Sequence, residues 1–553
     1  MVLTASTFCP HNVGTVNNQG IAMAVIAARR PPASSPSVVP AASPGARPGV
    51  VLAVVLLAAF AISLDTTIVN VGLPALSVQL PASTTDLQWI VDGYNLAFAA
   101  LVLSGGTVGD RFGRRGTLAA GLVLFAVGSA VAALAGGPGV LIALRVVMGA
   151  AAALIFPTTL SIISQVFPAR GARARAIGAW GAVTGAGVAV GPVVGGLLLE
   201  HFGWQAIFVA LVPVAVVALV GTWLSVPSDG AQSGARLDVR GLTVSVVALG
   251  SLVFTIIEAP DAGWTSARTL AGFALAAVAL VALVAVERRQ VAPMLDVRLF
   301  ANLRFTAASG AVTVAFFALF GFIFLITQYM QILRGYSPLS TGVRILPVAA
   351  SIAVTSATGT LLAVRIGNKA VVGTGLLLLV VAFGWISTAS ATLPYGVIAM
   401  QMVVLGCGLG LTTAPATESI MGVVRPEQAG AGSAVNDATR EVGGTLGVAI
   451  IGSVYASLYH SSLDSSPIPA AARSAAQSTY AASRSVAAGL PGRLGDVLLA
   501  NADSGFLDGL HAGCRVAAGV CLLGAMAVFA LLPSRPTAAV AIPDAGSVTA
   551  AAA

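Results

Sequence analysis

The sequence predicts an all-α polytopic membrane protein with fourteen transmembrane helices. Of its 553 residues, 57% are hydrophobic and only 9% are charged, and the mean hydropathy is +0.94. A water-soluble domain carries roughly 25% charged residues, so most of the surface of this chain must face hydrocarbon. A helix that crosses a bilayer needs about 20 apolar residues, and segments of that kind recur along the chain.

The apolar segments are regularly spaced from residue 50 onward. The first six predict an N-terminal six-helix bundle within 49–226, at 50–74, 87–108, 117–136, 139–163, 174–199 and 205–226. The next two predict an inserted helix pair within 227–290, at 240–258 and 268–286. The last six predict a C-terminal six-helix bundle within 291–535, at 305–330, 339–363, 370–389, 393–417, 431–457 and 511–532.

The remaining segments are rich in small or polar residues. We expect disordered cytoplasmic tails at 1–48 and 536–553, with Met1 or Met23 as the start, and an extracytoplasmic hairpin or floppy segment at 458–510. Arginines concentrate in the loops that fourteen crossings would place on the side of the N-terminus. The positive-inside rule therefore predicts a multi-pass protein of the bacterial inner membrane with both termini in the cytoplasm.

Composition also argues against several classes of function. The net charge of +8 is scattered through short loops and forms no basic patch, so we expect no nucleic-acid partner. The four cysteines form no CxxC pair and the four histidines are scattered, which predicts neither a metal site nor a disulfide framework. The chain has no Walker loop and no nucleophile elbow. We therefore expect no cofactor and no enzymatic activity.

The loop after the second span carries a patterned set of glycines and charges: Gly106, Asp110, Arg111, Gly113, Arg114 and Arg115. Glycines permit a tight turn and a close helix approach, and Asp110 can accept hydrogen bonds from an arginine. The run resembles the cytoplasmic signature of the major facilitator superfamily, with Val108 in place of leucine. The resemblance implies a gate at this loop.

A weaker copy of this loop follows span ten, with Arg365, Gly367 and Lys369 in place and Val364 at the acidic position. Two related loops are typical of transporters built from pseudo-symmetric halves. The major facilitator fold then implies two six-helix bundles plus two extra helices around a central cavity that opens alternately to each side.

Span five is rich in small residues and contains Gly178, Gly187, Gly191, Pro192, Gly195 and Gly196. Small residues let membrane helices pack closely, and a Gly-Pro pair bends a helix. Generic packing of small residues is the alternative interpretation. The spacing resembles the antiporter signature of drug/proton exporters, which implies outward transport of the substrate.

Two acids lie in apolar surroundings near the outer part of the N-terminal half. Asp65 stands in Leu64-Asp65-Thr66-Thr67-Ile68-Val69-Asn70, and Asp92 follows Trp89-Ile90-Val91. An acid at that depth costs about 2.5–3.5 kcal/mol on insertion scales, so it usually serves a function. The first run resembles the fourteen-spanner EmrB/QacA-type drug:proton antiporters. Structural capping by Asp65 and a bland surface position for Asp92 are the alternatives.

Two further groups of charges fall inside predicted helices. Arg145, in span four, is followed by a glycine four residues later, as in that family, and a buried cation needs an acidic partner. Span thirteen opens with a cluster of Asn436, Asp437, Arg440 and Glu441. Its spacing predicts that Arg440 pairs with Asp437 on one helical face. We expect a gate or a self-satisfied cluster there.

Taken together, these features predict a proton-driven efflux transporter. Asp65, Asp92 and Arg145 are expected to couple protons to the export of amphipathic drugs, antiseptics or antibiotics, cationic ones included. The expected partners are the substrate, protons and the lipid bilayer, and the expected state is a monomer. A proton-coupled exporter or importer of one narrow endogenous metabolite is the alternative, and a membrane sensor or scaffold that does not transport is a third.

Overall fold

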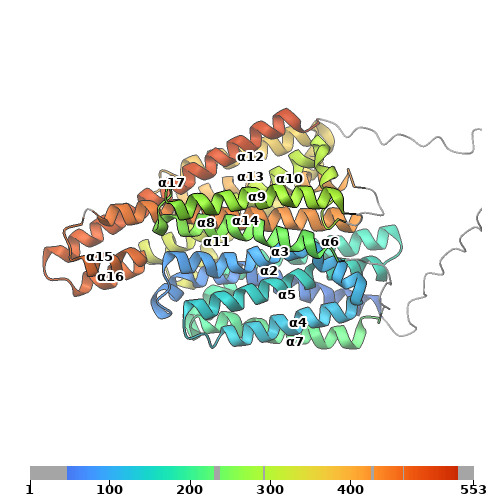
Figure 1. Ribbon diagram of the computed structural model, residues 1–553, viewed down its shortest axis with the longest axis horizontal. Coiled ribbons are helices and arrows are strands. Elements are labelled where there is room, and N and C mark those ends of the chain that lie inside the picture. Colours follow the sequence, from blue (N-terminus) through green and yellow to red (C-terminus); the bar gives the residue numbers. More distant parts are fainter. Residues whose placement is uncertain (1–46, 229–236, 291–292, 425–428, 465, 534–553) are drawn as a thin grey trace, which may run out of the picture. The chain divides into compact units, whose positions relative to one another are not determined.

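The computed structural model describes residues 47–228, 237–290, 293–424, 429–464 and 466–533 (Figure 1). These residues form helices and no strand. Fourteen of the helices are long and apolar enough to cross a membrane, which confirms the predicted number. The predicted tails lie outside the described residues, apart from residues 47 and 48.

The first six long helices pack with one another and form the N-terminal bundle. Their bounds are α2 Pro48–Gln79, α3 Thr84–Phe112, α4 Arg114–Ala132, α5 Pro138–Val166, α6 Arg170–Phe202 and α7 Gln205–Ser225. In Figure 1 α2, α4, α5 and α7 lie together, coloured blue to turquoise, and α3 packs extensively on α5. The connections are only a few residues long, so consecutive helices run antiparallel, and the largest contacts join helices that are not consecutive, α3 with α5 and α2 with α6.

The last six long helices form the second bundle in the same way. Their bounds are α10 Leu303–Gln328, α11 Pro338–Ile366, α12 Asn368–Ile386, α13 Tyr395–Met421, α14 Ala429–Asp464 and α17 Arg493–Leu531. A π-helical turn, η2 Tyr329–Leu333, extends α10, and a 3₁₀ turn, η1 Val297–Ala301, precedes it. The helix pairs α10–α14 and α11–α13 correspond to α2–α6 and α3–α5 of the first bundle.

The inserted pair comprises α8 Val239–Ala262 and α9 Ala267–Arg289. Helix α8 packs on α3 of the first bundle and on α14 of the second, whereas α9 packs on α8. Val253, Ile256 and Ile257 of α8 form a small buried core with Ala449 of α14. Figure 1 shows the green helices α8 and α9 beside α14. The insertion therefore covers the line along which α3 meets α14.

Glycine ends two corresponding helices at the related loops. Gly113, with φ 93°, ends α3 and begins α4, and Gly367, with φ 89°, ends α11 and begins α12. Both angles lie in the left-handed region that glycine adopts without a steric cost. The two loops that share a sequence pattern thus share a backbone conformation as well.

Of the two alternatives expected for 458–510, a hairpin or a floppy segment, the second is wrong, because most of the described residues there are helical. Helix α14 continues to Asp464, α15 Ala470–Ser478 and α16 Tyr480–Gly489 follow, and α17 begins at Arg493. Hydropathy marks the part of a helix that lies in hydrocarbon and gives no signal where the helix continues into water. For this reason span fourteen, expected at 511–532, is much longer at its N-terminal side.

We name the two ends of the helical bundle by residues. The Asp110 end carries the α3–α4 loop, and the Thr84 end is the opposite one, where α3 begins. At the Thr84 end a capping box fixes the start of α3, because Ser83 Oγ accepts from the backbone N–H of Asp86 and the Asp86 carboxylate accepts from that of Ser83. Helices α15 and α16 lie at this end, where Thr84 donates to the carbonyl of Ser478 at 3.1 Å.

Candidate transport site

A buried ion pair joins two helices of the N-terminal bundle. Nη1 of Arg145 on α5 donates to both carboxylate oxygens of Asp65 on α2, at 2.7 and 2.9 Å. The two side chains are 1% and 0% exposed. Arg145 Nε donates to the carbonyl of Ile90 on α3 at 2.9 Å, and its guanidinium stacks on the Tyr94 ring, 4.2 Å from the centroid. Asp65 is therefore the acidic partner that Arg145 required.

Close backbone packing positions this pair. Gly149, one turn after Arg145, lies against the backbone of Tyr94, so closely that a Cβ there would overlap the Tyr94 carbonyl. Gly93 likewise faces Ile142 and Val146 of α5. These glycines let α3 and α5 approach until the Tyr94 ring covers the guanidinium. The geometry explains why a glycine follows the arginine at this spacing.

Asp92 does not belong to the ion pair. It is two residues from Tyr94, and residues at that spacing point about 200° apart on a helix. Its side chain is fully buried, and within the described part of the chain neither carboxylate oxygen has a hydrogen-bond partner. The prediction thus identified two acids in different settings, one paired with an arginine and one unpaired.

A polar stripe that we had not predicted runs along α3 through Asp92. Gln88, Asp92 and Asn95 recur at i, i+4 and i+7, and all three are buried. Gln88 Nε2 donates across to α14, to the carbonyl of Ala449 at 3.2 Å and to Ser453 Oγ at 3.3 Å. The stripe therefore faces the contact between the two bundles. Its helical spacing is a signal that the sequence contained.

The predicted antiporter glycines pack α6 against two neighbours. A Cβ on Gly187 would lie 2.9 Å from Ser63 Cβ, one on Gly195 would lie 2.9 Å from Ile68, and Gly191 faces Thr67, all on α2. Gly196 instead faces α11, where a Cβ would lie 2.7 Å from the Cα of Leu339. Pro192 belongs to the same crossing, because its carbonyl faces Gly342 of α11.

Gly178, the first residue of that motif, has a different environment. A Cβ at Gly178 would meet no atom of the described residues within 4 Å, and the same holds for Gly181 and Gly185. All three lie in the half of α6 toward the Asp110 end. The glycines that bring α6 and α11 together therefore lie toward the Thr84 end.

A third contact joins the bundles at the Thr84 end. Gln331, in the π-helical turn after α10, donates to the carbonyl of Val71 on α2 at 2.9 Å. Together with the Gln88 bonds and the Gly196 crossing, it joins the two bundles at this end on α2, α3 and α6.

The motif for which we predicted a gate lies at the Asp110 end. Asp110 accepts from Arg114 Nη2 at 2.9 Å and from Nε at 3.2 Å, and Arg114 also donates to Gln165 of α5.

The other motif residues contact neighbouring helices or residues. Arg115 donates to the carbonyl of Trp223 on α7 at 2.6 Å and stacks on its ring, and Arg111 stacks on Phe112. Gly106 lies against Pro157 of α5. The motif thus connects α3, α4, α5 and α7 within one bundle.

The cluster on α14 differs from its predicted pairing. Among the described residues Arg440 makes no ion pair with Asp437 within 4 Å, and its guanidinium lies over the Phe316 ring, 5.3 Å from the centroid. The i, i+3 spacing permits a pair, but the arginine side chain follows the neighbouring helix α10. Asn436 accepts from Thr417 at 3.1 Å, and Oε2 of Glu441 is buried without a described partner.

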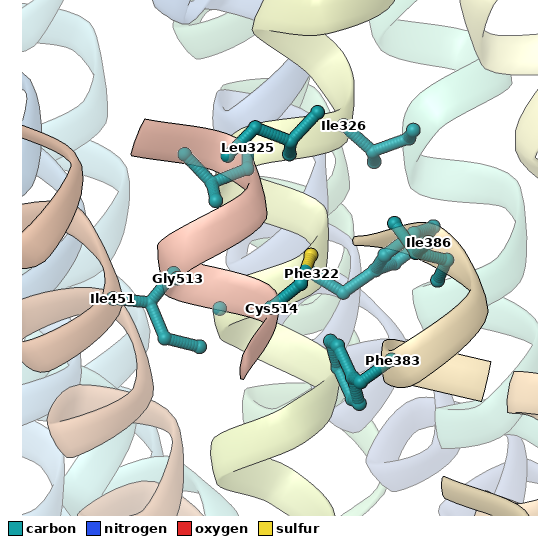
Figure 2. A pocket seen from close by; sticks show the side chains of 10 residues that line it. Phe322, Leu325, Ile326, Phe383, Ile386, Ile451, Gly513 and Cys514 are labelled. Atoms are coloured by element: carbon teal, nitrogen blue, oxygen red, sulfur yellow. The ribbon is translucent and has the colours of Figure 1, made fainter. Parts of the chain in front are cut away.

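A small apolar void lies inside the second bundle, not between the bundles (Figure 2). Its volume is about 10 Å³, comparable to the space that one water occupies. The figure shows side chains from several helices converging on it: Phe322, Leu325 and Ile326 of α10, Phe383 and Ile386 of α12, Ile451 of α14, and Gly513 and Cys514 of α17. Drug-sized ligands need several hundred Å³, so this void is a gap in packing.

The sequence matches the profile described as Major Facilitator Superfamily over residues 55–448. The chain belongs to this superfamily. The resemblance noted from its motifs is thereby confirmed, and the motif residues from Asp65 to Glu441 all fall inside the matched region.

Relatives in this superfamily are named as resistance and export proteins. The chain is 35% identical to the multidrug resistance protein Stp of Mycobacterium tuberculosis, over 74% of this chain and 76% of that one. It is 32% identical to the tetracenomycin C resistance and export protein of Streptomyces glaucescens, over 86% and 90%. It is 34% identical to the multidrug efflux pump LfrA of Mycolicibacterium smegmatis, over 86% and 94%.

Solved structures support the fold. A bacterial homologue of the human lysosomal transporter Spinster, in an inward-facing and occupied conformation, superposes with a TM-score of 0.65 at 17% identity, over 88% of this chain and 97% of that one. At this identity the likeness concerns the fold alone. Two six-helix bundles with an inserted pair are therefore a fourteen-helix version of the major facilitator fold.

Proposed function

We propose that this chain is a proton-driven exporter of amphipathic drugs, antiseptics or antibiotics, cationic ones included. The observation that carries the proposal is the buried set of Asp65, Arg145 and unpaired Asp92 in a superfamily member whose relatives are named as resistance pumps. A carboxylate without a partner in a membrane interior is most stable with a proton bound. A proton or a cationic substrate can therefore compete for the same group.

Coupling in this proposal runs through two different acids. Asp92 takes up a proton or meets the positive charge of the substrate, since nothing in its described surroundings compensates a negative charge. Asp65 is paired with Arg145, and protonation of this acid would release the arginine. Tyr94 is on the same helix as Asp92, and its ring covers the arginine. Protonation at one acid would then alter the packing of the helix that carries the other.

The arrangement of the bundles supports alternating access. The two bundles contact each other at the Thr84 end, through Gln88, Gln331 and Gly196, while the α6 glycines toward the Asp110 end face open space. The arginine-rich loops at the Asp110 end support a cytoplasmic position for that end, as the positive-inside rule predicts. This conformation accepts substrate from the inside. Release outward requires the contacts at the Thr84 end to open, and we propose that a monomer performs the cycle.

The test uses a pump-deficient bacterium that accumulates a fluorescent lipophilic cation. Expression of the wild type should lower accumulation, and a protonophore should abolish the effect. Asp92→Asn should fail to export, because the amide cannot exchange a proton. The matched control is Asp508→Asn, the same change at an exposed carboxylate of α17. Equal export by Asp92→Asn and the control would contradict the role of Asp92.

A narrower substrate is the second candidate. Among the relatives are the tetracenomycin protein and a probable actinorhodin transporter of Streptomyces coelicolor, 32% identical over 76% of this chain. Their names refer to single microbial products. If the wild type does not change accumulation of any cationic dye, export of one endogenous metabolite becomes the favoured function.

A further inference from the structure

Two arginines meet at the Thr84 end of the second bundle, where α10 gives way to α11. Gly335, with φ 67°, turns the chain sharply between Arg334 and the start of α11, the helix that carries Arg344. The backbone N–H of Tyr336 bonds to the carbonyl of Met330 at 3.0 Å, which folds the turn back on the π-helical end of α10. Arg334 and Tyr336, on either side of the glycine, are thereby held together.

The arginines share one aromatic ring. The guanidinium carbon of Arg344 lies 4.4 Å from the centroid of the Tyr336 ring, and that of Arg334 lies 5.6 Å from it. Tyr395, the first residue of α13, stacks on Arg344 at 5.3 Å. Arg334 donates to the carbonyl of Leu393 at 2.6 Å and to the Tyr336 hydroxyl at 3.2 Å. We call these four residues, Arg334, Tyr336, Arg344 and Tyr395, the Arg–Tyr cluster.

The Arg–Tyr cluster carries two positive charges without an acidic partner. Within the described residues no carboxylate lies within 4 Å of either guanidinium. Glu200, at the nearby end of α6, accepts instead from the hydroxyl of Ser337. Arg344 donates to Ser340, but its Nε is buried and has no described partner. Hydrogen bonds to carbonyl groups and stacking on aromatic rings do not neutralise the two positive charges.

The depth of Arg344 in the membrane makes its uncompensated positive charge costly. Arg344 lies about two turns inside α11, a membrane-spanning helix, and an unpaired cation there is costly. Its side chain extends back toward Ser340 and Tyr336, that is, toward the membrane surface. Tyrosines at such a boundary sit at the level of lipid headgroups. An anion at this position would complete the charge balance.

We propose that the Arg–Tyr cluster binds the headgroup phosphate of an anionic phospholipid in the leaflet at the Thr84 end. Guanidinium groups bind phosphate through paired N–H donors, and Arg334 and Arg344 are both only half-buried, so their guanidinium groups can supply such donors. A membrane lipid is favoured over a soluble anion, because the half-buried cluster lies beside apolar helices that acyl chains can cover. Such a lipid would hold the α10–α11 turn against the start of α13.

Native mass spectrometry of the purified full-length chain tests the proposal. Dioleoyl phosphatidylglycerol is titrated into the wild type and into Arg334→Gln/Arg344→Gln, with dioleoyl phosphatidylcholine and inorganic phosphate as separate probes. The double variant should bind phosphatidylglycerol about 30-fold more weakly, the loss that two arginines account for near an anionic lipid. Phosphatidylcholine should bind the wild type more weakly than phosphatidylglycerol does.

Matched variants separate binding from folding. Arg334 lies in a turn, so its replacement is not expected to disturb α11. Arg334→Gln should weaken phosphatidylglycerol binding about fivefold. Arg515→Gln, an exposed arginine of α17 that donates to the carbonyl of His511, should not change it. Equal phosphatidylglycerol binding by the wild type and Arg334→Gln would overturn the proposal. It would also be overturned if inorganic phosphate competed as well as the lipid, because the ligand would then be a soluble anion.

Discussion

Arg145 and Asp65 form an ion pair that is sealed from solvent on every side, with one nitrogen of the arginine bonded to both oxygens of the acid. The pair connects α5 to α2, and the backbone of α3 accepts the remaining Nε bond. A buried charge that loses its partner is far more costly than a pair that is removed as a whole. Replacing one member of the pair should therefore destabilise the protein more than replacing both members.

Asp65→Asn should destabilise the protein by about 3–5 kcal/mol and abolish export, because Arg145 remains charged and unpaired. Asp65→Asn/Arg145→Met should recover most of the stability and none of the export. Thermal unfolding in detergent and accumulation of a fluorescent cation measure the two effects. A single variant that melts like the wild type would show that the guanidinium finds another partner.

Gly191→Ala should lower stability by about 1–3 kcal/mol and reduce transport, since the new methyl group would collide with Thr67. It would also disturb the bond from Thr67 to the carbonyl of Val188, 3.2 Å long. Gly178→Ala provides the control within the same motif, because a Cβ there meets no described atom. Its helix should be stabilised by up to about 1 kcal/mol. Similar losses from both changes would contradict the packing described for α6.

Gln88→Met should loosen the contact between the bundles at the Thr84 end, because methionine fills the space but cannot donate to Ala449 and Ser453. In a variant without native cysteines, Ser457→Cys supplies a reporter one turn beyond Ser453 on α14. A membrane-impermeant maleimide should label it faster when Gln88 is replaced. Gln290→Met, at the opposite end of the inserted pair, should not change the labelling rate.

Tyr480→Phe should destabilise the α15–α16 segment by about 1–3 kcal/mol, the cost of losing a hydrogen bond to a charged group. The Tyr480 hydroxyl donates to the Asp503 carboxylate of α17, and its ring packs on Phe506. Burial, together with Asp503, raises the pKa of Tyr480, so the hydroxyl stays a donor at all ordinary pH values. Hydrogen exchange should quicken in residues 470–489, while Ser478→Ala leaves it unchanged.

The sequence allowed the membrane helices to be counted because an apolar stretch of about 20 residues is a one-dimensional signal. Asp65 and Arg145 stood out for a similar reason, since charges inside such stretches are rare. Tyr94 and Gln88 were missed, because an aromatic or an amide in a span has many ordinary explanations. Their importance depends on which helix lies opposite.

The remaining differences have the same origin in tertiary contacts. Spacing alone placed Arg440 beside Asp437, but the ring of Phe316 on another helix attracts the guanidinium. Helices α15 and α16 come from an Ala- and Ser-rich segment with little periodicity. They are held by an aromatic cluster in which Tyr459 of α14 and Phe506 of α17 both pack on Tyr480, and these residues are far apart in the sequence.

The inserted pair makes the two sides of the molecule unequal for a compound dissolved in the bilayer. Helix α8 fills the seam between α3 and α14, with Trp89 and Leu96 of α3 packed against its small core. The opposite contact between the bundles, α6 with α11, is covered by neither helix of the inserted pair among the described residues, and its close approach is at Gly196 and Gly342. A lipid-soluble molecule that diffuses sideways toward the centre of the protein therefore meets three packed helices, α3, α8 and α14, on one flank and only two, α6 and α11, on the other.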